Sequence, residues 1–417
     1  MERLISSLGL VAFIALAWLM SSHKQKFPLR IVLGSLALQF AVALLILKTS
    51  LGQQLFAGLG AFFQAIINCT DAGTAFLFDL YPQPGDLPLP PQYTLWRCFA
   101  FGVLPTIILF SSLMGILYHW GIMQRIVGFC ALVMQKTLGT SGAETLSAAA
   151  NIFVGQTEAP LVVRPYVCKM TLSELNVVMV GGFATIAGGV LAIFIRIGID
   201  AGHLITASVI SAPAALLIAK VMQPETEHSQ TAGHVEIEVQ SKCVNVIEAA
   251  AEGASTGMQL AINVAAMLLA FVALVAMIDL GIGWLGSQFG YEAETAWTLS
   301  KLFGLFFAPF AWLMGIPWHE CQTAGSLLGT KMVVNEVLAY YQLVEAADQN
   351  ALAPRTVTIL TYALCGFANF GSIGIQLGGI GGIAPERRAD LAKLGLRAMF
   401  GGALAAFMTA CVAAILL

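Results

Sequence analysis

Long, nearly uninterrupted apolar stretches recur along the chain. Segments of this kind lie at residues 4–20, 31–47, 99–117, 177–195, 205–221, 261–278 and 398–417. Roughly 20 apolar residues suffice for a helix to cross the hydrocarbon core of a bilayer. The pattern therefore predicts an all-α membrane protein that crosses the bilayer several times.

Two apolar segments are interrupted by polar residues and are expected to lie along the membrane surface. Residues 51–68 carry Gln53, Gln54, Gln64 and Asn68, and residues 123–136 mix apolar with basic and amide side chains. Such mixtures favour interfacial amphipathic helices over spanning ones. The proline-rich residues 79–93 between them are typical of an ordered loop.

From Leu138 onward, the apolar pieces become too short to cross a bilayer. Residues 141–154 resemble a short helix, "GQTEAP" at 155–160 breaks it, and an apolar run returns at 161–170. Residues 301–343 have a similar pattern, with a Gly-Pro break at 315–317. Two short helices joined at such a break predict a re-entrant hairpin, because non-helical backbone is tolerated at membrane depth only where it is buried or lines a cavity.

An internal repeat supports this organisation. "GGFATIAGGV" at 181–190 aligns without gaps to "CGFANFGSIG" at 365–374, an offset of 184 residues, and each decad follows one predicted hairpin. Gly, Thr, Asn and Ser replace helix formers there, so each segment is expected to unwind. Paired hairpins and broken helices are typical of a secondary transporter with its site near the bilayer midplane.

Composition and charge exclude several other functions. The chain is 58% hydrophobic and 10% charged, with a net charge of -3, so no basic surface for nucleic acid is expected. It lacks a P-loop, a G-x-S-x-G motif and a paired His-Glu zinc motif, and its eight Cys residues form no C-x-x-C pair. An enzyme is therefore not expected.

The distribution of basic residues predicts the orientation. With both hairpins folding back on the side they enter, thirteen Lys and Arg residues lie on one side and seven on the other. Lys220 belongs to the larger group and Lys331 to the smaller one. Because basic residues prefer the cytoplasmic side, both chain termini are expected outside.

Glu158 is the most informative polar residue of the first hairpin. A carboxylate at the centre of a membrane costs roughly 2.5–3.5 kcal/mol on insertion scales, which is usually tolerated only for function. Gln156 and Thr157 beside it offer amide and hydroxyl groups to a neutral polar ligand. The alternative is an exposed turn at the membrane surface, in which Arg164 pairs with Glu158.

The second half contributes a further polar group. Glu336 follows Asn335, and Asn369 and Ser372 share one face if their segment is helical, with Phe367 close by as a stacking surface. The alternatives are a solvated helix end for Glu336 and ordinary helix–helix hydrogen bonding for Asn369 and Ser372. Glu144 and Glu320 are expected to be structural.

Four motifs, taken in order, resemble the bacterial branch of the concentrative nucleoside transporter family. They are "GQTEAPLVVRPY", "GGFATIAGGV", "NEVLAY" and "CGFANFGSIGI", and the resemblance covers essentially the whole chain. It implies eight transmembrane helices, two re-entrant hairpins, interfacial helices and an inverted repeat. It also implies a homotrimer in the bacterial inner membrane that imports nucleosides with Na+.

The resemblance also implies roles for individual residues. The expected nucleoside-binding residues are Gln156, Thr157, Glu158, Val190, Leu260, Glu336, Phe367, Asn369 and Ser372. Of these, the first three would bind the nucleobase edge, and Glu336, Asn369 and Ser372 the ribose. The expected Na+ ligands are the side chains of Asn151 and Thr185 and the carbonyls of Val154 and Ile186.

Several alternatives remain at this level. A proton could replace Na+ with Glu158 titrating, and a passive facilitator could use the same polar residues. Val337 stands where the family resemblance leads us to expect Phe, with no consequence that the sequence reveals. The segments predict four parts: a scaffold at 1–137, a first repeat at 138–222, a loop with a long connecting span at 223–298, and a second repeat at 299–417.

Overall fold

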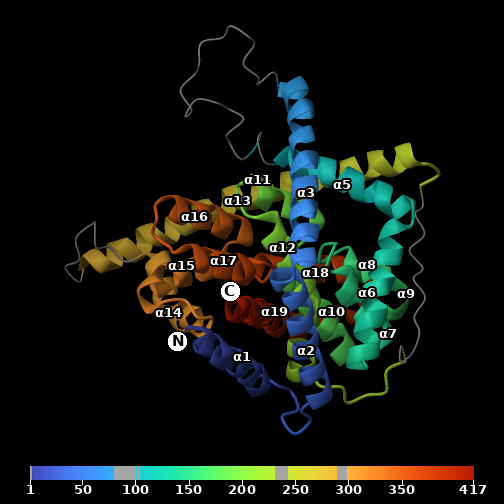
Figure 1. The fold of residues 1–417 in the computed structure, drawn as a ribbon, viewed down its shortest axis with the longest axis horizontal. Helices are drawn as coiled ribbons and strands as arrows, with labels where there is room; N and C mark the ends of the chain where they lie inside the picture. The colour runs from blue at the N-terminus through green and yellow to red at the C-terminus, as the bar shows by residue number, and fades with distance from the viewer. Residues whose placement is uncertain (1, 79–99, 101–103, 231–242, 289–297) are drawn as a thin grey trace.

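A computed structural model describes residues 2–78, 100, 104–230, 243–288 and 298–417. Helices dominate these residues and none of them forms a strand, which confirms the all-α prediction (Figure 1). The proline-rich loop at 79–93 and most of the acidic loop at 223–240 lie outside the described residues.

The predicted apolar stretches coincide with helices. Those that are long and apolar enough to cross a membrane are α1 (Glu2–Leu19), α2 (Leu29–Lys48), α3 (Ser50–Phe78), the α10–α11 segment (Leu172–Ala184 and Gly188–Arg196), α12 (Ala201–Met222), α13 (Val246–Gln288) and α19 (Arg388–Leu416). Within the described residues this makes seven candidate spans by length and composition, or eight with one bent pair. The count of eight transmembrane helices stays a prediction.

The two helices expected at the membrane surface differ from each other. Helix α3 has 29 residues, longer than predicted, and Figure 1 shows it projecting beyond the neighbouring helices. Helix α6 (Ile122–Leu138) follows α5 (Leu104–His119) after a bend of 79° at Gly121, where φ is +73°. The path of each helix relative to the bilayer stays a prediction.

The first predicted hairpin is present as short helices around a turn. Helix α7 (Gly142–Ala150) ends at Asn151, and the chain resumes in α8 (Ala159–Val162) and α9 (Arg164–Val167). Ser141 and Glu144 form a capping box at the start of α7, which fixes where this arm begins. The turn at residues 151–158, called the first tip below, contains the predicted break.

The second predicted hairpin contains the predicted break at residues 315–317 and a further one at residues 334–335. Gly315 (φ +87°) lies in the turn between α14 (Leu299–Leu313) and η3 (Trp318–Glu320), which leads into α15 (Cys321–Val333). The break beside Glu336 is at Val334–Asn335, between α15 and α16 (Glu336–Asp348). The predicted break at residues 315–317 is therefore present, while the sequence interpretation missed the further break at Val334–Asn335, which is called the second tip below.

Both repeat decads contain a helix break, as predicted. Helix α10 ends at Ala184 and α11 resumes at Gly188, while α17 (Pro354–Leu364) and α18 (Phe370–Ile383) are separated by residues 365–369. We call helices α6–α12 the first helix set and helices α14–α19 the second helix set. In each set a turn is followed by a tip, a broken helix and a long helix. An inverted relation between them stays a prediction.

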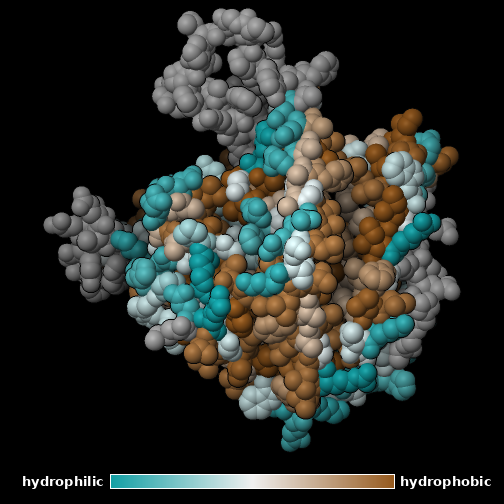
Figure 2. All heavy atoms as spheres, in the orientation of Figure 1, coloured by the Kyte–Doolittle hydropathy of each residue, from teal (hydrophilic) through white to brown (hydrophobic). Residues whose placement is uncertain are grey.

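The core lies among the last helices of each set. The candidate spans in α10–α11 and α12 are 89% buried, and that ending in α19 is 83% buried. By contrast, α1 and α2 are 28% buried and α13 only 6%. Figure 2 shows wide apolar areas over α1 and α2, with polar atoms at the turn between them, as expected of helices that face lipid.

Two of the basic residues counted for the orientation are buried inside the protein. Lys220 is 3% exposed and lies 2.7 Å from Glu144, so it joins α12 to the first hairpin. Lys331 is fully buried in α15. Glu144 is structural, as predicted, and so is Glu320, which accepts a hydrogen bond from Ala353 N at 3.0 Å.

Helices α5 and α13 approach closely through glycines. A Cβ at Gly253 would stand 2.4 Å from Ser111 O, and one at Gly257 would stand 2.8 Å from Ile108 Cα. These glycines form a G-x-x-x-G pair on α13, the small-residue pattern that lets membrane helices pack backbone to backbone.

Replacing Gly253 by Leu is expected to separate α5 from α13. Overpacking of this kind costs about 1–3 kcal/mol or more, and here the opposing atom is backbone that cannot rotate away. The measurement is the melting temperature of the purified protein in detergent. Gly281→Leu on the same helix is the matched control, since nothing lies within 4 Å of a Cβ there; equal melting temperatures for the two variants would contradict the packing.

Candidate functional site

The two tips and the two helix breaks place polar caps inside the protein. Asn335 begins α16, where its Oδ1 accepts Leu338 N at 3.0 Å, and Asn369 begins α18, where its Oδ1 accepts Ser372 N at 2.8 Å. Asn is among the preferred N-cap residues because its oxygen satisfies an otherwise unpaired amide. Both caps are 5% exposed or less, so these helices start within the protein interior.

A continuous hydrogen-bond chain joins the first hairpin to the second. Gln156 Nε2 donates to Ser372 Oγ at 3.1 Å, Ser372 N donates to Asn369 Oδ1, and Asn369 Nδ2 donates to Glu336 Oε2 at 3.0 Å. All four residues are at most 6% exposed. Four of the nine predicted nucleoside-binding residues therefore form one connected, buried network.

Gln376 extends this network and was missed by the sequence interpretation. Its Nε2 donates to Gln156 Oε1 and to Met179 O, each at 3.1 Å, and it is fully buried. A Cβ at Gly182 would stand 2.8 Å from Gln376 Nε2, so the glycine makes room for the amide. The available signal was its position one helical turn after Ser372 in an otherwise apolar segment.

Three further predicted residues make no side-chain hydrogen bond to this network. Thr157 lies against α18, where a Cβ at Gly379 would stand 2.9 Å from Thr157 Cγ2. Phe367 is buried in the break between α17 and α18, and its carbonyl accepts Asn369 N at 2.8 Å. Val190 is buried in the first turn of α11.

Glu158 and Leu260 are elsewhere, in a separate cavity. This cavity of about 530 Å³ lies between α5, the first hairpin, the start of α11 and α13, and Tyr118 and Glu252 also line it. Glu158 is exposed there, and its Oε2 accepts Gly155 N at 3.3 Å. Glu158 and Arg164 are both described and form no ion pair, so the predicted alternative pairing is absent.

The predicted Na+ ligands gather where the first tip meets the break in α10. A Cβ at Gly181 would stand 3.0 Å from Asn151 Nδ2, and Thr185 Oγ1 donates to Gly181 O at 2.9 Å. Gly188 N donates to Phe153 O at 3.2 Å, which holds the tip against the start of α11.

The oxygens at this junction suit a small cation. Asn151 Oδ1 is buried and has no hydrogen-bond partner among the described residues, and the same holds for Ser147 Oγ one turn earlier. In the described part of the chain, no hydrogen bond reaches the carbonyls of Val154 and Ile186 either. Buried unpaired acceptors are costly, and neutral oxygens of this kind are ligands that hard cations accept. The donor set therefore fits Na+.

Metal chemistry of the transition-metal type has no comparable support. Across the described ranges, no group of three or more His, Cys, Asp and Glu side chains could hold a metal ion. The junction described above offers amide, hydroxyl and carbonyl oxygens instead.

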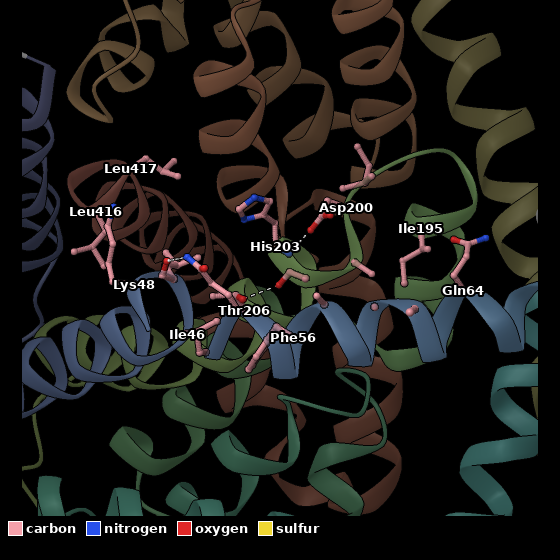
Figure 3. Close-up of a pocket in the computed structure, with 18 of the residues that line it drawn as sticks. Ile46, Lys48, Phe56, Gln64, Ile195, Asp200, His203, Thr206, Leu416 and Leu417 are labelled. Carbon is pink, nitrogen blue, oxygen red and sulfur yellow. Dashed lines mark hydrogen bonds between the residues drawn. The ribbon is translucent and has the colours of Figure 1, made fainter. Parts of the chain in front are cut away.

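A larger surface hollow does not contain the predicted residues. It measures about 720 Å³ and is lined by α3, the start of α12 and the C-terminal residues Leu416 and Leu417. Figure 3 shows Asp200 and His203 pointing toward it, with His203 N donating to Asp200 Oδ1 at 2.8 Å. This bond is the N-cap of α12, so its role there is structural.

Replacing Gln376 by Leu should weaken the connection between the hairpins. The variant leaves Gln156 Oε1 and Met179 O unpaired, and each buried unpaired group costs about 1–3 kcal/mol. Ligand affinity at the network is expected to fall about tenfold or more, as measured by calorimetry in detergent. Gln349→Leu on an exposed helix end serves as control; parental affinity in Gln376→Leu would contradict the role of Gln376.

Family comparisons agree along nearly the whole chain. Residues 8–80 and 203–414 match models described as the N-terminus and C-terminus of "Na+ dependent nucleoside transporter", and residues 100–201 match one described as "Nucleoside recognition". An uncharacterized transporter, YutK, of Bacillus subtilis is 42% identical over 99% of both chains. Sodium/nucleoside cotransporter 1 of Rattus norvegicus is 39% identical and covers 100% of this chain, which spans 64% of the rat protein.

Solved structures are equally similar. The structure of CNTnw in an inward-facing substrate-bound state has a TM-score of 0.91 and 43% identity, covering 100% of this chain and 98% of that one. A variant of CNTnw in an outward-facing state has a TM-score of 0.91 at 42% identity. Relatives this similar over the full length establish the family, whose members are transporters rather than enzymes. The chain belongs to the family of Na+-dependent, concentrative nucleoside transporters.

Proposed function

We propose that this protein is a symporter that moves nucleosides into the cell together with Na+, with its binding site between the two tips. The observation that carries the proposal is the buried chain from Gln156 through Ser372 and Asn369 to Glu336. It connects the two hairpins with amide, hydroxyl and carboxylate groups.

These groups complement a nucleoside. A nucleoside is neutral and carries a base edge with several donors and acceptors, plus ribose hydroxyls that donate. Glu336, Asn369 and Ser372 offer acceptors and donors for the ribose, and Gln156 offers an amide for the base edge. On binding, the hydrogen bonds between these side chains would be replaced by hydrogen bonds to the nucleoside, so few buried polar groups would lack a partner.

The residues around the network supply the remaining recognition. Val190 and Phe367 give apolar surface for the base, and Phe367 can stack on it. Thr157 adds a hydroxyl at the first tip. Glu158 and Leu260 line the separate cavity described above, and we propose that they meet the base from that side.

Na+ would bind Asn151, Thr185 and the carbonyls of Val154 and Ile186. Asn151 and Gln156 belong to the same tip, five residues apart, so an ion that orders the turn also positions the amide. Each ligand then favours the binding of the other, and this coupling is reciprocal by linkage. Uphill uptake needs such a coupling.

The transport cycle proposed is alternating access. The similar protein CNTnw was solved in an inward-facing state. Variants of CNTnw were solved in outward-facing and intermediate states. The hydrogen-bond chain between the two tips crosses the boundary between the two helix sets, where such movement would exchange its partners. We further propose a bacterial plasma-membrane location, both termini outside, and a homotrimer.

The exposed apolar face of α13 is consistent with contacts to lipid or to a second protomer. Leu269, Met277 and Trp284 are at least 62% exposed along it. Apolar patches of this kind mark membrane or protein interfaces.

The test is uptake of labelled uridine into proteoliposomes under an inward Na+ gradient, an inward proton gradient or no gradient. Accumulation above equilibrium only with Na+ is expected. Accumulation only with protons would show that a proton is the coupling ion in place of Na+. Glu158, which faces a cavity, would then be the carboxylate expected to bind the proton. Equilibration without accumulation would indicate a passive facilitator, and no uptake would overturn the nucleoside assignment.

A further inference from the structure

Lys331 is a buried cation that the proposed site does not use. It lies on α15 one turn before the second tip, is 0% exposed, and its Nζ donates to Ala363 O at 2.9 Å. It forms no ion pair with a carboxylate at salt-bridge distance in the described part of the chain. Glu336 is the carboxylate that acts on it electrostatically. A buried ammonium is expensive unless something compensates it, so its position calls for a function.

The compensation comes from the end of a helix. Ala363 is in the last turn of α17, which stops inside the protein at the break before α18. The carbonyls of that turn are taken by different donors: Thr361 O accepts Tyr340 Oη at 2.7 Å, and Tyr362 O accepts Cys365 N at 3.2 Å. A helix C-terminus carries partial negative charge and favours a cation. Lys331 provides that cation.

The first helix set has no such side chain at the corresponding place. The offset of 184 residues between the repeat decads also pairs Asn151 with Asn335, and it pairs Ser147 with Lys331. On the first side, the oxygens of Ser147 and Asn151 lack partners in the described chain. On the second side, Asn335 Oδ1 already accepts Leu338 N.

The backbone carbonyls that accept these side chains also differ between the two helix sets. The 184-residue offset pairs Ala363 O, which accepts the charged Lys331 ammonium, with Met179 O. Met179 O accepts the neutral amide of Gln376 at 3.1 Å. No Lys or Arg side chain is hydrogen-bonded to the described residues of this junction. One tip thus has unpaired oxygens and no positive charge, and the other has a positive charge and a satisfied cap.

We infer that the Lys331 ammonium is the fixed cation of the second helix set and organises the second tip as a Na+ from solution organises the first. The second tip is then organised at all times by a covalently attached charge. Only the first tip depends on the ion, so each nucleoside is coupled to one Na+. This inference rests on the proposed Na+-coupled function.

The assignment predicts opposite effects for two substitutions. Lys331→Met removes the ammonium and keeps the length of the side chain, so a second Na+ should become necessary. The Na+ concentration for half-maximal uridine binding should rise about tenfold, and the Hill slope for Na+ should move from about one toward about two. Lys331→Arg keeps the charge and should keep the parental slope.

Ser147→Lys is the reciprocal variant. It places an ammonium at the corresponding position of the first tip, beside Asn151 Oδ1. Uridine should then bind equally well in Na+ and in K+, as measured by calorimetry in detergent, which does not depend on transport. Lys393→Met, at an exposed position of α19, is the control for loss of a lysine and should behave as the parent.

The parent protein provides a third measurement. Uptake of radioactive sodium and labelled uridine into proteoliposomes should give about one ion per nucleoside. Two ions per nucleoside in the parent, or parental Na+ dependence in Lys331→Met, would overturn the inference. If Lys331→Met is not monodisperse, the parent ratio and Ser147→Lys decide. If the parent shows no Na+-driven uptake of uridine at all, the proposed function is contradicted instead.

Discussion

Glu336→Gln is expected to lower the efficiency of uridine uptake by about 10- to 100-fold. Hydrogen bonds to a charged group contribute about 1.5–3 kcal/mol, and the amide offers one acceptor oxygen where the carboxylate offers two. The remaining oxygen can still accept Asn369 Nδ2, so the network and the fold should persist. The loss should therefore appear in transport and binding, and the melting temperature should stay near that of the parent.

Two comparisons sharpen this experiment. Glu345→Gln, an exposed position on the same helix, removes the same charge and should transport as the parent does. Parent protein should also prefer uridine over 2'-deoxyuridine, and Glu336→Gln should lose most of that preference because the partner of the hydroxyl is gone. Equal uridine uptake by Glu336→Gln and the parent would contradict the ribose role.

Thr185→Val should raise the Na+ concentration for half-maximal uptake by about tenfold, which corresponds to about 1.4 kcal/mol. Valine has nearly the same shape but no oxygen, so it removes one proposed ion ligand at the break after α10. Thr185→Ser keeps the oxygen and should remain close to the parent. Na+-dependent thermal stabilisation in detergent measures the ion site without transport, because a ligand stabilises the state that binds it.

A matched threonine controls for the cost of the substitution itself. Thr409 Oγ1 donates to Ala405 O four residues earlier at 2.9 Å, as Thr185 Oγ1 does to Gly181 O. Thr409 is fully buried in α19, away from the predicted ligands. Thr409→Val should cost some stability and leave the Na+ dependence unchanged. The ion role of Thr185 is wrong if the two valine variants show the same Na+ dependence.

Periodicity and length were sufficient to predict the helices, because a membrane demands long apolar segments with internally satisfied backbones. The breaks at residues 185–187 and 365–369 were also predictable, since small and polar residues replace helix formers there. Four motifs then indicated the family, which the comparisons confirm. The roles of individual site residues stay predictions.

Tertiary contacts account for what the sequence did not reveal. The spacing of Gln376 from Ser372 was the one local signal, and its partners on α10 and the first tip become visible only in the packed structure. Lys331 was counted as a flanking charge because sequence position does not show burial. The second tip was missed because an Asn cap between two helices is a weaker local signal than a Gly-Pro turn.

Helix α13 has a consequence for the surrounding lipid. Its 43 residues correspond to about 65 Å at 1.5 Å per residue, about twice the thickness of a hydrocarbon core of roughly 30 Å. Glu248 and Glu252 occupy its first two turns, so we expect that end to lie in the headgroup region and part of the helix to extend beyond the hydrocarbon core. Because Glu252 and Leu260 line the cavity that holds Glu158, we expect the thickness of the host bilayer to affect access to that cavity.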